Sequence, residues 1–237
     1  MWADDLAARA VYHAVMEPVL TIRNLRFTRG HGFRLDIPSL EVRPGERVLV
    51  AGPSGCGKST LLWLVAGLLR PAQGEICVAG DRLDAMRESD RDRVRARSIG
   101  MVFQTHHLLP AFTASENVSM ALLAAGEPER LHASRAAELL GMLGVDRPDA
   151  PVSELSVGQQ QRVAIARAVA CRPALVLADE PTASLDPGHA EAAMALLQDA
   201  CRNSGAALLC ASHDPAMQAR FERVVDVASL VTRSDAA

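Results

Sequence analysis

The chain has 237 residues, of which 49 % are hydrophobic, and it carries a formal net charge of −3 at pH 7. This length suffices to bury a sizeable core. The weakly acidic balance, the lack of a basic stripe and an aromatic content of only 3 % argue against nucleic-acid binding. The five cysteines are scattered without CxxC spacing, which indicates reduced thiols in a cytoplasm.

The N-terminal segment does not predict a targeting signal. Asp4 and Asp5 stand where a signal peptide carries basic residues, and no apolar core follows them. The longest fully apolar run, near Leu61–Leu69, is far too short to span a membrane. We expect three parts along the chain: an extension over residues 1–18 that is helical or frayed, one domain over residues 19–231, and a tail over residues 232–237.

Residues 19–50 open the predicted domain with alternating apolar and polar side chains. The apolar positions Leu20, Ile22, Leu25 and Phe27 are typical of half-exposed strands. We therefore expect this stretch to form a small antiparallel β part.

A glycine-rich segment follows the apolar run Val48–Ala51 and precedes an apolar helical stretch. The pattern G-x-x-x-x-G-K-[ST] is filled by Gly52, Pro53, Ser54, Gly55, Cys56, Gly57, Lys58 and Ser59. Its glycines let successive backbone N–H groups curl around phosphate oxygens, and the positive end of the helix adds attraction. Lys58 is expected to reach the β- and γ-phosphates of a nucleotide, and Ser59 to offer its hydroxyl to Mg²⁺. The next residue, Thr60, is also expected to contact the nucleotide. Cys56 is interpreted as an incidental, partly exposed thiol.

Two helical regions are predicted next. The mixed-sign charged run Arg82–Arg97 is typical of the solvated face of a helix. Residues 105–153 predict a helical insertion, in which four apolar residues at helical spacing are expected to pack internally: Ala136, Leu139, Leu140 and Leu143. The tandem His106 and His107 are interpreted as surface loop residues, because no third metal ligand accompanies them.

A second anion-binding pattern occurs in the segment Leu155–Arg162. Ser156 and Gly158 precede a helix predicted over Gln159–Ala170, so a hydroxyl, backbone N–H groups and a positive helix end would face outward. Because the chain already has a phosphate-binding segment, this second site would be redundant within one copy.

Two adjacent carboxylates end the next apolar run. The run Ala174–Ala178 predicts a strand buried on both faces of a parallel sheet. Asp179 and Glu180 follow at its carboxyl end, where open α/β sheets bind ligands. Asp179 is expected to hold Mg²⁺ through water, and Glu180 to polarise the water that attacks the γ-phosphate. The alternative, a solvated acidic turn before Pro181, is disfavoured by the phosphate-binding pattern upstream.

These three segments, in this order, resemble those of the ATP-binding cassette (ABC) ATPases, and the resemblance extends over residues 19–227. It implies an α/β fold: a P-loop NTPase (RecA-like) core with a small antiparallel β part and an α-helical insertion. It also implies ATP and Mg²⁺ as cofactors, and ATP hydrolysis by a head-to-tail homodimer. In that dimer the signature residues Ser156, Gly158 and Gln159 would close on the γ-phosphate held by the other copy.

Three single positions complete the resemblance. Gln104, after the apolar strand Ile99–Phe103, would reach Mg²⁺ and the attacking water. Asp186 ends the segment Ser184–Asp186, which is similar to the family's D-loop and would cross to the partner copy. His213 follows a further apolar run and matches the histidine that contacts the γ-phosphate.

The family's adenine-stacking position is a departure. Arg29 stands where family members usually have an aromatic residue. A guanidinium plane can stack on a base, and Phe27 or Phe33 could take its place. The stacking residue therefore stays open, which affects nucleotide preference but not phosphate binding.

Five segments resemble one branch of the family, the lipoprotein-releasing and macrolide-export branch: Phe103–Gln104, His107–Pro110, Thr113–Val118, Ser153–Ser156 and Gln160–Ala168. The branch implies a separate integral membrane permease, a cytoplasmic location on the inner face of the cell membrane, and export of a lipoprotein, drug or other amphiphile. The alternative is a cell-division-type ABC ATPase that signals through a membrane partner without transporting cargo. A P-loop kinase or DNA-repair ATPase is disfavoured by the short insertion and the absence of a coiled coil.

The loop over residues 105–112 is a candidate contact with that membrane partner. Leu108, Leu109 and Phe112 could form one wall of a groove for a short helix of the permease. The alternative is that these side chains pack within the insertion.

Overall fold

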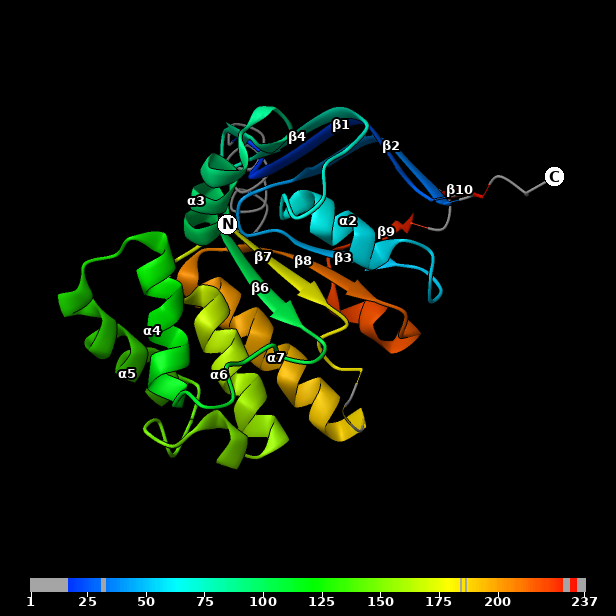
Figure 1. Ribbon diagram of the computed structural model, residues 1–237. Coiled ribbons are helices and arrows are strands. Elements are labelled where there is room, and N and C mark those ends of the chain that lie inside the picture. Colours follow the sequence, from blue (N-terminus) through cyan, green and yellow to red (C-terminus); the bar gives the residue numbers. More distant parts are fainter. Residues whose placement is uncertain (1–16, 31–32, 184, 186, 228–230, 234–237) are drawn as a thin grey trace, which may run out of the picture.

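The computed structural model describes residues 17–30, 33–183, 185, 187–227 and 231–233. Most of the predicted N-terminal extension and of the predicted tail lies outside these residues. The described chain forms one antiparallel and one parallel sheet, each of five strands, with helices between and beside them (Figure 1). This is the predicted α/β architecture.

The antiparallel sheet lies at one end of the molecule. Its strands run in the order β10 (Val231–Arg233), β2 (Phe33–Val42), β1 (Leu20–Arg29), β4 (Gln73–Val78) and β5 (Asp81–Arg82). The predicted alternation is present in β1, where Leu20, Ile22, Leu25 and Phe27 are buried between exposed polar residues. Asn24, at a φ of 47°, shifts the alternation by one residue.

The parallel sheet carries the strands that end at the site described below. Its order is β6 (Ile99–Phe103), β7 (Leu175–Asp179), β8 (Ala207–Ser212), β3 (Arg47–Ala51) and β9 (Arg223–Asp226). The expectation that residues 19–50 form only antiparallel strands is wrong for β3, which pairs in parallel with β8 and β9. Its three central residues are all fully buried, as they are in a strand covered on both faces.

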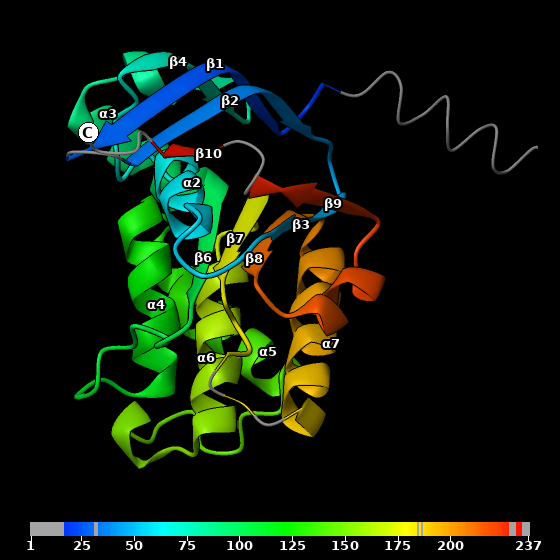
Figure 2. The ribbon, with the colours of Figure 1, turned by 90° about the vertical axis from the view of Figure 1, so that its right-hand side faces the viewer.

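Alternate residues of the parallel sheet face two separate cores. Leu49 and Val176 pack with the helices on one face, whereas Val48, Val50 and Leu175 pack against the antiparallel sheet. Helix α2 (Lys58–Val65) lies between the two sheets, as Figures 1 and 2 both show, and its apolar side chains fill the second core. Helices α6 (Val157–Val169) and α7 (Pro187–Ser204) lie on the first face.

The predicted helical insertion consists of α4 (Ala114–Ala125) and α5 (His132–Met142), with short 3-10 turns at Glu129–Leu131 and Val152–Glu154. Thr113 caps α4: its hydroxyl accepts from the N–H of Glu116, whose carboxylate accepts from the N–H of Thr113. The four apolar residues predicted to pack internally are buried: Ala136, Leu139, Leu140 and Leu143.

The charged run before β6 differs in part from its prediction. Residues 82–87 of the run are not α-helical and include a 3-10 turn at Leu83–Ala85, whereas the remainder forms α3 (Glu88–Ser98). Most of α3 is solvated, but Arg91 is only 7 % exposed because its aliphatic stem lies over Gly67. A further 3-10 helix, Pro215–Arg220, connects β8 to β9.

Candidate active site

The predicted site residues follow the carboxyl ends of neighbouring parallel strands. The ladder pairs Ala51 with Ser212, Ala211 with Asp179, and Asp179 with Phe103. The loops after β3, β8, β7 and β6 therefore start at one edge of the sheet. These loops bring the glycine-rich segment, His213, Glu180 and Gln104 to that edge.

The glycine-rich loop connects β3 to α2 in a backbone shape that requires glycine. Gly55 and Gly57 have φ values of 77° and 104°, which side chains disfavour. Gly57 precedes the first residue of α2 and offers no side chain to cap it, so N–H groups of the first turn remain for an anion. Cys56 is buried, at 6 % exposure, which corrects the expectation of a partly exposed thiol.

Lys58 is the only lysine of the sequence, and its ammonium lies inside the loop. Its Nζ donates to the carbonyl oxygens of Gly52 at 2.8 Å and Pro53 at 3.2 Å, and lies 3.3 Å from Oε1 of Glu180. The residue is 6 % exposed. A single, well-oriented positive charge is thus held where the loop would bind phosphate.

Ser59 and Asp179 form the candidate magnesium site. The Ser59 hydroxyl donates to Oδ1 of Asp179 at 2.9 Å. Burial raises the pKa of Asp179, and the neighbouring Glu180 adds to this, while the hydrogen bond from Ser59 opposes it. A hydroxyl and a carboxylate are the hard oxygen donors that Mg²⁺ prefers, and Mg²⁺ takes its remaining ligands from water and phosphate. The residues present therefore fit this ion, although no group of three His, Cys, Asp or Glu side chains that could hold a metal occurs in the described ranges.

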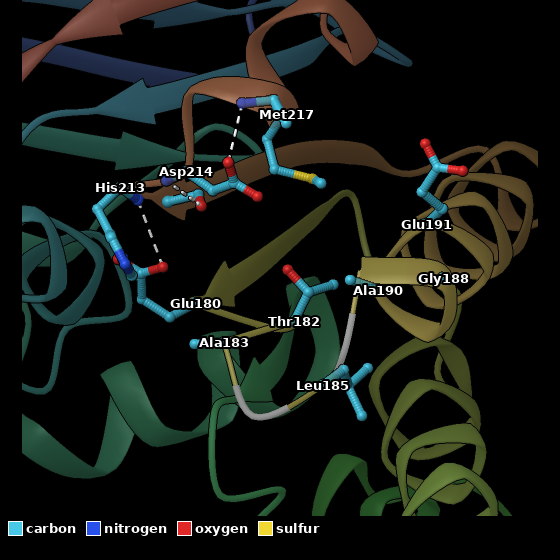
Figure 3. A pocket seen from close by; sticks show the side chains of 12 residues that line it. Glu180, Thr182, Ala183, Leu185, Gly188, Ala190, Glu191, His213, Asp214 and Met217 are labelled. Atoms are coloured by element: carbon cyan, nitrogen blue, oxygen red, sulfur yellow. Dashed lines mark hydrogen bonds and ion pairs between the residues drawn. The ribbon is translucent and has the colours of Figure 1, made fainter.

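Glu180 has a strained backbone and a fixed side chain. Its φ is 47°, in the left-handed region that non-glycine residues rarely adopt. Its N–H donates to Ala211 O at 3.0 Å, and its Oε1 lies 2.9 Å from Nδ1 of His213 (Figure 3). Strain of this kind clusters at functional positions. The direct contact between Glu180 and His213 was not predicted from the sequence, which assigned the histidine only to the γ-phosphate.

Two cavities flank these residues. One, of about 360 Å³, lies beside the glycine-rich loop and is lined by Arg29 and Phe33 as well as Lys58 and Ser59. Both remaining adenine-stacking candidates thus face it, whereas Phe27 is buried in the core. The other, of about 410 Å³, lies beyond Glu180 and His213 and includes Leu185 (Figure 3). The predicted D-loop residues Ser184 and Asp186 lie outside the described residues.

The signature segment forms the start of α6. The helix begins at Val157, two residues earlier than predicted, and Ser156 caps it by accepting from the N–H of Gln159 at 3.3 Å. The Gln159 amide donates to Asp146 at 2.7 Å. Val157 is 53 % exposed, and the Cα of Gly158 faces open space. No signature residue lines the cavity beside the glycine-rich loop.

The loop after Gln104 is held by α6 rather than being a free surface loop. Arg167 of α6 donates to the carbonyl oxygens of His107 at 2.6 Å and His106 at 2.7 Å. Both histidines have positive φ, 57° at His106 and 47° at His107. His106 is buried, which corrects its interpretation as a surface residue, and burial, with Arg167 nearby, lowers its pKa. Gln104 is exposed and makes no hydrogen bond to any described residue.

The three residues predicted to form a groove wall, Leu108, Leu109 and Phe112, do not lie together on one cleft. Leu108 packs on the core of the insertion, while Leu109 and Phe112 are about two-fifths exposed, at 39 % and 40 %. None of the three lines the neighbouring cleft of about 540 Å³ between α3, β6, α4 and α6. That cleft is lined by apolar residues and three arginines, among them Met101, Phe103, Ala121, Ala124, Arg93, Arg95 and Arg167.

One contact that sequence reasoning missed connects α6 to the acidic turn. The buried amide of Gln161 donates to the carbonyl oxygen of Pro181 at 2.9 Å. A signal for its burial was present, because Gln161 precedes Ala164, Ile165 and Ala168 at helical spacing on the buried face.

Comparisons with known proteins agree with this geometry. The model of the family described as "ABC transporter" matches residues 35–183. The lipoprotein-releasing system ATP-binding protein LolD of Paramagnetospirillum magneticum is 46 % identical over 188 residues, which is 79 % of this chain and 83 % of that protein. The LolD of Novosphingobium aromaticivorans is 44 % identical over 215 residues, covering 88 % and 96 %.

Solved structures show the same similarity. The dimeric, post-hydrolysis structure of the ATP-binding cassette MJ0796 bound to ADP and phosphate has a TM-score of 0.75 at 32 % identity, covering 87 % of this chain and 93 % of that one. The structure of cbiO1 from Clostridium perfringens, part of an ABC transporter complex, has a TM-score of 0.73 at 31 % identity, covering 84 % and 79 %.

Proposed function

This chain belongs to the ABC transporter family as an ATP-binding, ATP-hydrolysing subunit, and we propose that it powers a membrane complex that releases lipoproteins. The observation that carries the cargo assignment is the 46 % identity with a lipoprotein-releasing ATP-binding protein over 79 % of the chain. The same similarity favours export over the cell-division alternative.

We propose the following roles at the site. Lys58 and the N–H groups at the start of α2 bind the β- and γ-phosphates of ATP. Ser59 and Asp179 hold Mg²⁺ with Gln104, and the ion neutralises charge on the phosphates. Glu180 orients the attacking water and accepts its proton, while His213 fixes the Glu180 carboxylate and reaches the γ-phosphate. Two contacts of Lys58 support this assignment: its ammonium donates to the carbonyl oxygen of Gly52 in the glycine-rich loop, and it lies beside the carboxylate of Glu180.

The nucleotide is proposed to be hydrolysed in a homodimer. Ser156, Gly158 and the start of α6 are exposed and outside the cavity of the glycine-rich loop, which suits a surface that binds the nucleotide of a second copy. The dimeric structure of the similar cassette MJ0796 supports this arrangement. A two-fold axis then pairs each glycine-rich loop with a signature segment of the other copy.

A membrane subunit is required by this proposal, since no described helix is both long and apolar enough to cross a bilayer. We propose that a permease holds the chain at the cytoplasmic face of the membrane. A short helix of the permease would bind at the cleft between α3, β6 and α4. The exposed Leu109 and Phe112, in the loop after β6, are proposed to contact the permease as well.

The proposal is tested by reconstitution with the permease proteins that co-purify with this chain. Membrane vesicles that carry the complex and a labelled lipoprotein should release the lipoprotein when ATP is added, and should not do so with the Glu180→Gln variant. ATP hydrolysis without release of any lipoprotein would contradict the cargo assignment but not the ATPase activity.

A further inference from the structure

The buried amide of Gln161 connects two parts of the site that serve different nucleotides in the proposed dimer. Gln161 is only 4 % exposed, and its Nε2 donates to the carbonyl oxygen of Pro181 at 2.9 Å. Its neighbours in the sequence differ from it: Gln160 is half-buried and Arg162 is exposed. The other buried residues of α6 are all apolar, so Gln161 is the one polar residue on the buried face of this helix.

The acceptor belongs to the turn that carries Glu180. Glu180 has a φ of 47° and precedes a proline, which restricts its backbone further. Two backbone hydrogen bonds hold its own peptide groups: its N–H donates to Ala211 O at 3.0 Å, and its carbonyl accepts from Ala183 N at 3.2 Å. Pro181 has no N–H, so its carbonyl is its one backbone group able to hydrogen-bond, and Gln161 binds it.

The donor, Gln161, follows the signature residue Gly158 by three residues, about one turn of α6. Ser156 caps α6 through the N–H of Gln159, and Gln161 follows two residues later in the same first turns of the helix. A helix transmits displacement along its axis with little deformation, so movement of Ser156 and Gly158 would move the Gln161 amide. The hydrogen bond to Pro181 then carries that movement to the peptide next to Glu180.

We propose that Gln161 is a positioning residue that couples the signature segment to Glu180 of the same chain. Closure of a second copy on the signature residues shifts the peptide next to Glu180 and thereby adjusts the position of its carboxylate, which acts on this chain's own nucleotide. Contact with the partner at one composite site thereby prepares the other site for hydrolysis. This inference rests on the proposed dimer, but not on the identity of the cargo.

A second glutamine of the chain provides a matched control. Gln198 of α7 is 8 % exposed, and its Nε2 donates to the carbonyl oxygen of Arg220 at 3.0 Å. It thus makes the same kind of buried hydrogen bond as Gln161, but to a turn that carries no candidate catalytic group. Any effect common to Gln161→Met and Gln198→Met reports on the loss of a buried hydrogen bond, and any difference reports on Glu180.

The first experiment measures steady-state ATP hydrolysis by the two methionine variants. Gln161→Met should lower kcat about tenfold or more, with the KM for ATP changed less than about twofold, because small displacements of a catalytic group slow chemistry without weakening binding. Gln198→Met should leave kcat within about twofold of wild type. An equal loss of kcat in both variants, or an unchanged kcat in Gln161→Met, would overturn the proposal.

The second experiment uses Gln161→Glu, which has the same shape but donates to the Pro181 carbonyl only when it is protonated. Burial raises the pKa of such a carboxyl group. The ratio of its kcat to that of wild type should therefore rise as the pH falls from about 8 to about 6, while thermal unfolding at each pH checks that both proteins remain folded. A ratio that does not change with pH would contradict the positioning role, and this holds even if Gln161→Met fails to fold.

The third experiment separates positioning from assembly. The double variant Glu180→Gln/Gln161→Met should still dimerise in ATP, because Gln161 acts on the carboxylate after the copies have closed. Loss of that dimer would assign Gln161 to assembly and overturn the proposed role. If all three results are as expected but reconstituted vesicles do not release lipoprotein, the proposed cargo is contradicted and the role of Gln161 is not.

Discussion

Glu180 and His213 contact one another directly, with Nδ1 of His213 2.9 Å from Oε1 of Glu180. The same carboxylate oxygen lies 3.3 Å from Nζ of Lys58. The two residues follow different strands, β7 and β8, whose register aligns their ends. The carboxylate is thus oriented from two sides by groups of the site itself. Such preorganisation lowers the cost of aligning a base with water during the reaction.

Glu180→Gln should bind ATP but hydrolyse it at least about 100-fold more slowly, because an amide keeps the shape of the side chain yet cannot accept a proton. The nucleotide-bound protein should then accumulate as a dimer. Phosphate release and size-exclusion chromatography in ATP measure both effects. Glu138→Gln, which changes an exposed carboxylate paired with Arg135, is the control. Equal hydrolysis rates in Glu180→Gln and wild type would remove Glu180 from the catalytic role.

Lys58→Ala should weaken ATP binding by about tenfold or more, since charge-assisted hydrogen bonds to the phosphates are lost. Titration calorimetry measures the affinity. Because Lys58 is the only lysine of the sequence, an amine-reactive reagent also reports on it: bound ATP should protect this side chain from modification in the wild-type protein, as mass spectrometry can follow. Unchanged affinity in Lys58→Ala, together with no protection, would contradict the assignment of the glycine-rich loop.

Ser156→Arg should leave ATP binding by the isolated copy intact and abolish ATP-dependent dimerisation and turnover, because a bulky side chain at the exposed start of α6 blocks closure. Mixing this variant with Lys58→Ala creates a heterodimer in which one composite site has an intact loop and an intact signature segment. Recovery of hydrolysis in the mixture would show that one complete site suffices, and no recovery would show that the two sites are strictly coupled. Normal activity of Ser156→Arg alone would exclude action on the partner's nucleotide.

Arg167→Lys should destabilise the protein by about 1–3 kcal/mol, because an ammonium cannot bind both carbonyl oxygens that the guanidinium binds, and a charge-assisted hydrogen bond is lost. Urea unfolding measures the change. Arg202→Lys affects only an exposed pair with Asp199 and should change the free energy of unfolding by less than about 0.5 kcal/mol. The same change in both variants would show that the contacts of Arg167 with the loop after Gln104 do not contribute to stability.

Leu109→Ser/Phe112→Ser should weaken co-purification of the permease while sparing the ATPase activity of the isolated subunit, since both side chains are partly exposed and outside the core. Leu108→Ser, at a position that packs on the core of the insertion, should instead lower the thermal stability. Undiminished permease binding by the double variant would exclude these two residues from the interface.

The local motifs were predictable because their residues are contiguous and their chemistry is set by sequence spacing. The glycine-rich loop, the acidic strand end and the cap of α6 all occur where their patterns indicate. Contacts between distant segments were not predictable in the same way. Arg167, a half-buried residue, binds a carbonyl 60 residues away in sequence, and the periodicity of α6 does not indicate which loop its side chain contacts. The burial of His106, whose carbonyl oxygen Arg167 also binds, likewise depends on the packing of distant segments.

The apolar pattern of the sequence also could not decide which of the two sheets a strand joins. An apolar run such as Val48–Val50 is compatible with either sheet, because both bury apolar side chains. Pairing with β8 and β9, which lie more than 150 residues further along the chain, decides it. The groove wall was only partly decided by the sequence for a similar reason: an apolar loop residue can face the core or a partner. Leu108 faces the core, whereas partner contact by the exposed Leu109 and Phe112 stays a prediction.

The positive φ of Glu180 implies a trade-off between stability and activity at this one position. A glycine would adopt that backbone without strain, and relieving such strain is worth on the order of 1–3 kcal/mol. The chain nevertheless carries there a long side chain that precedes a proline and ends between an ammonium and an imidazole. Glycine or asparagine at residue 180 is therefore expected to increase the free energy of unfolding, and both replacements remove the carboxylate.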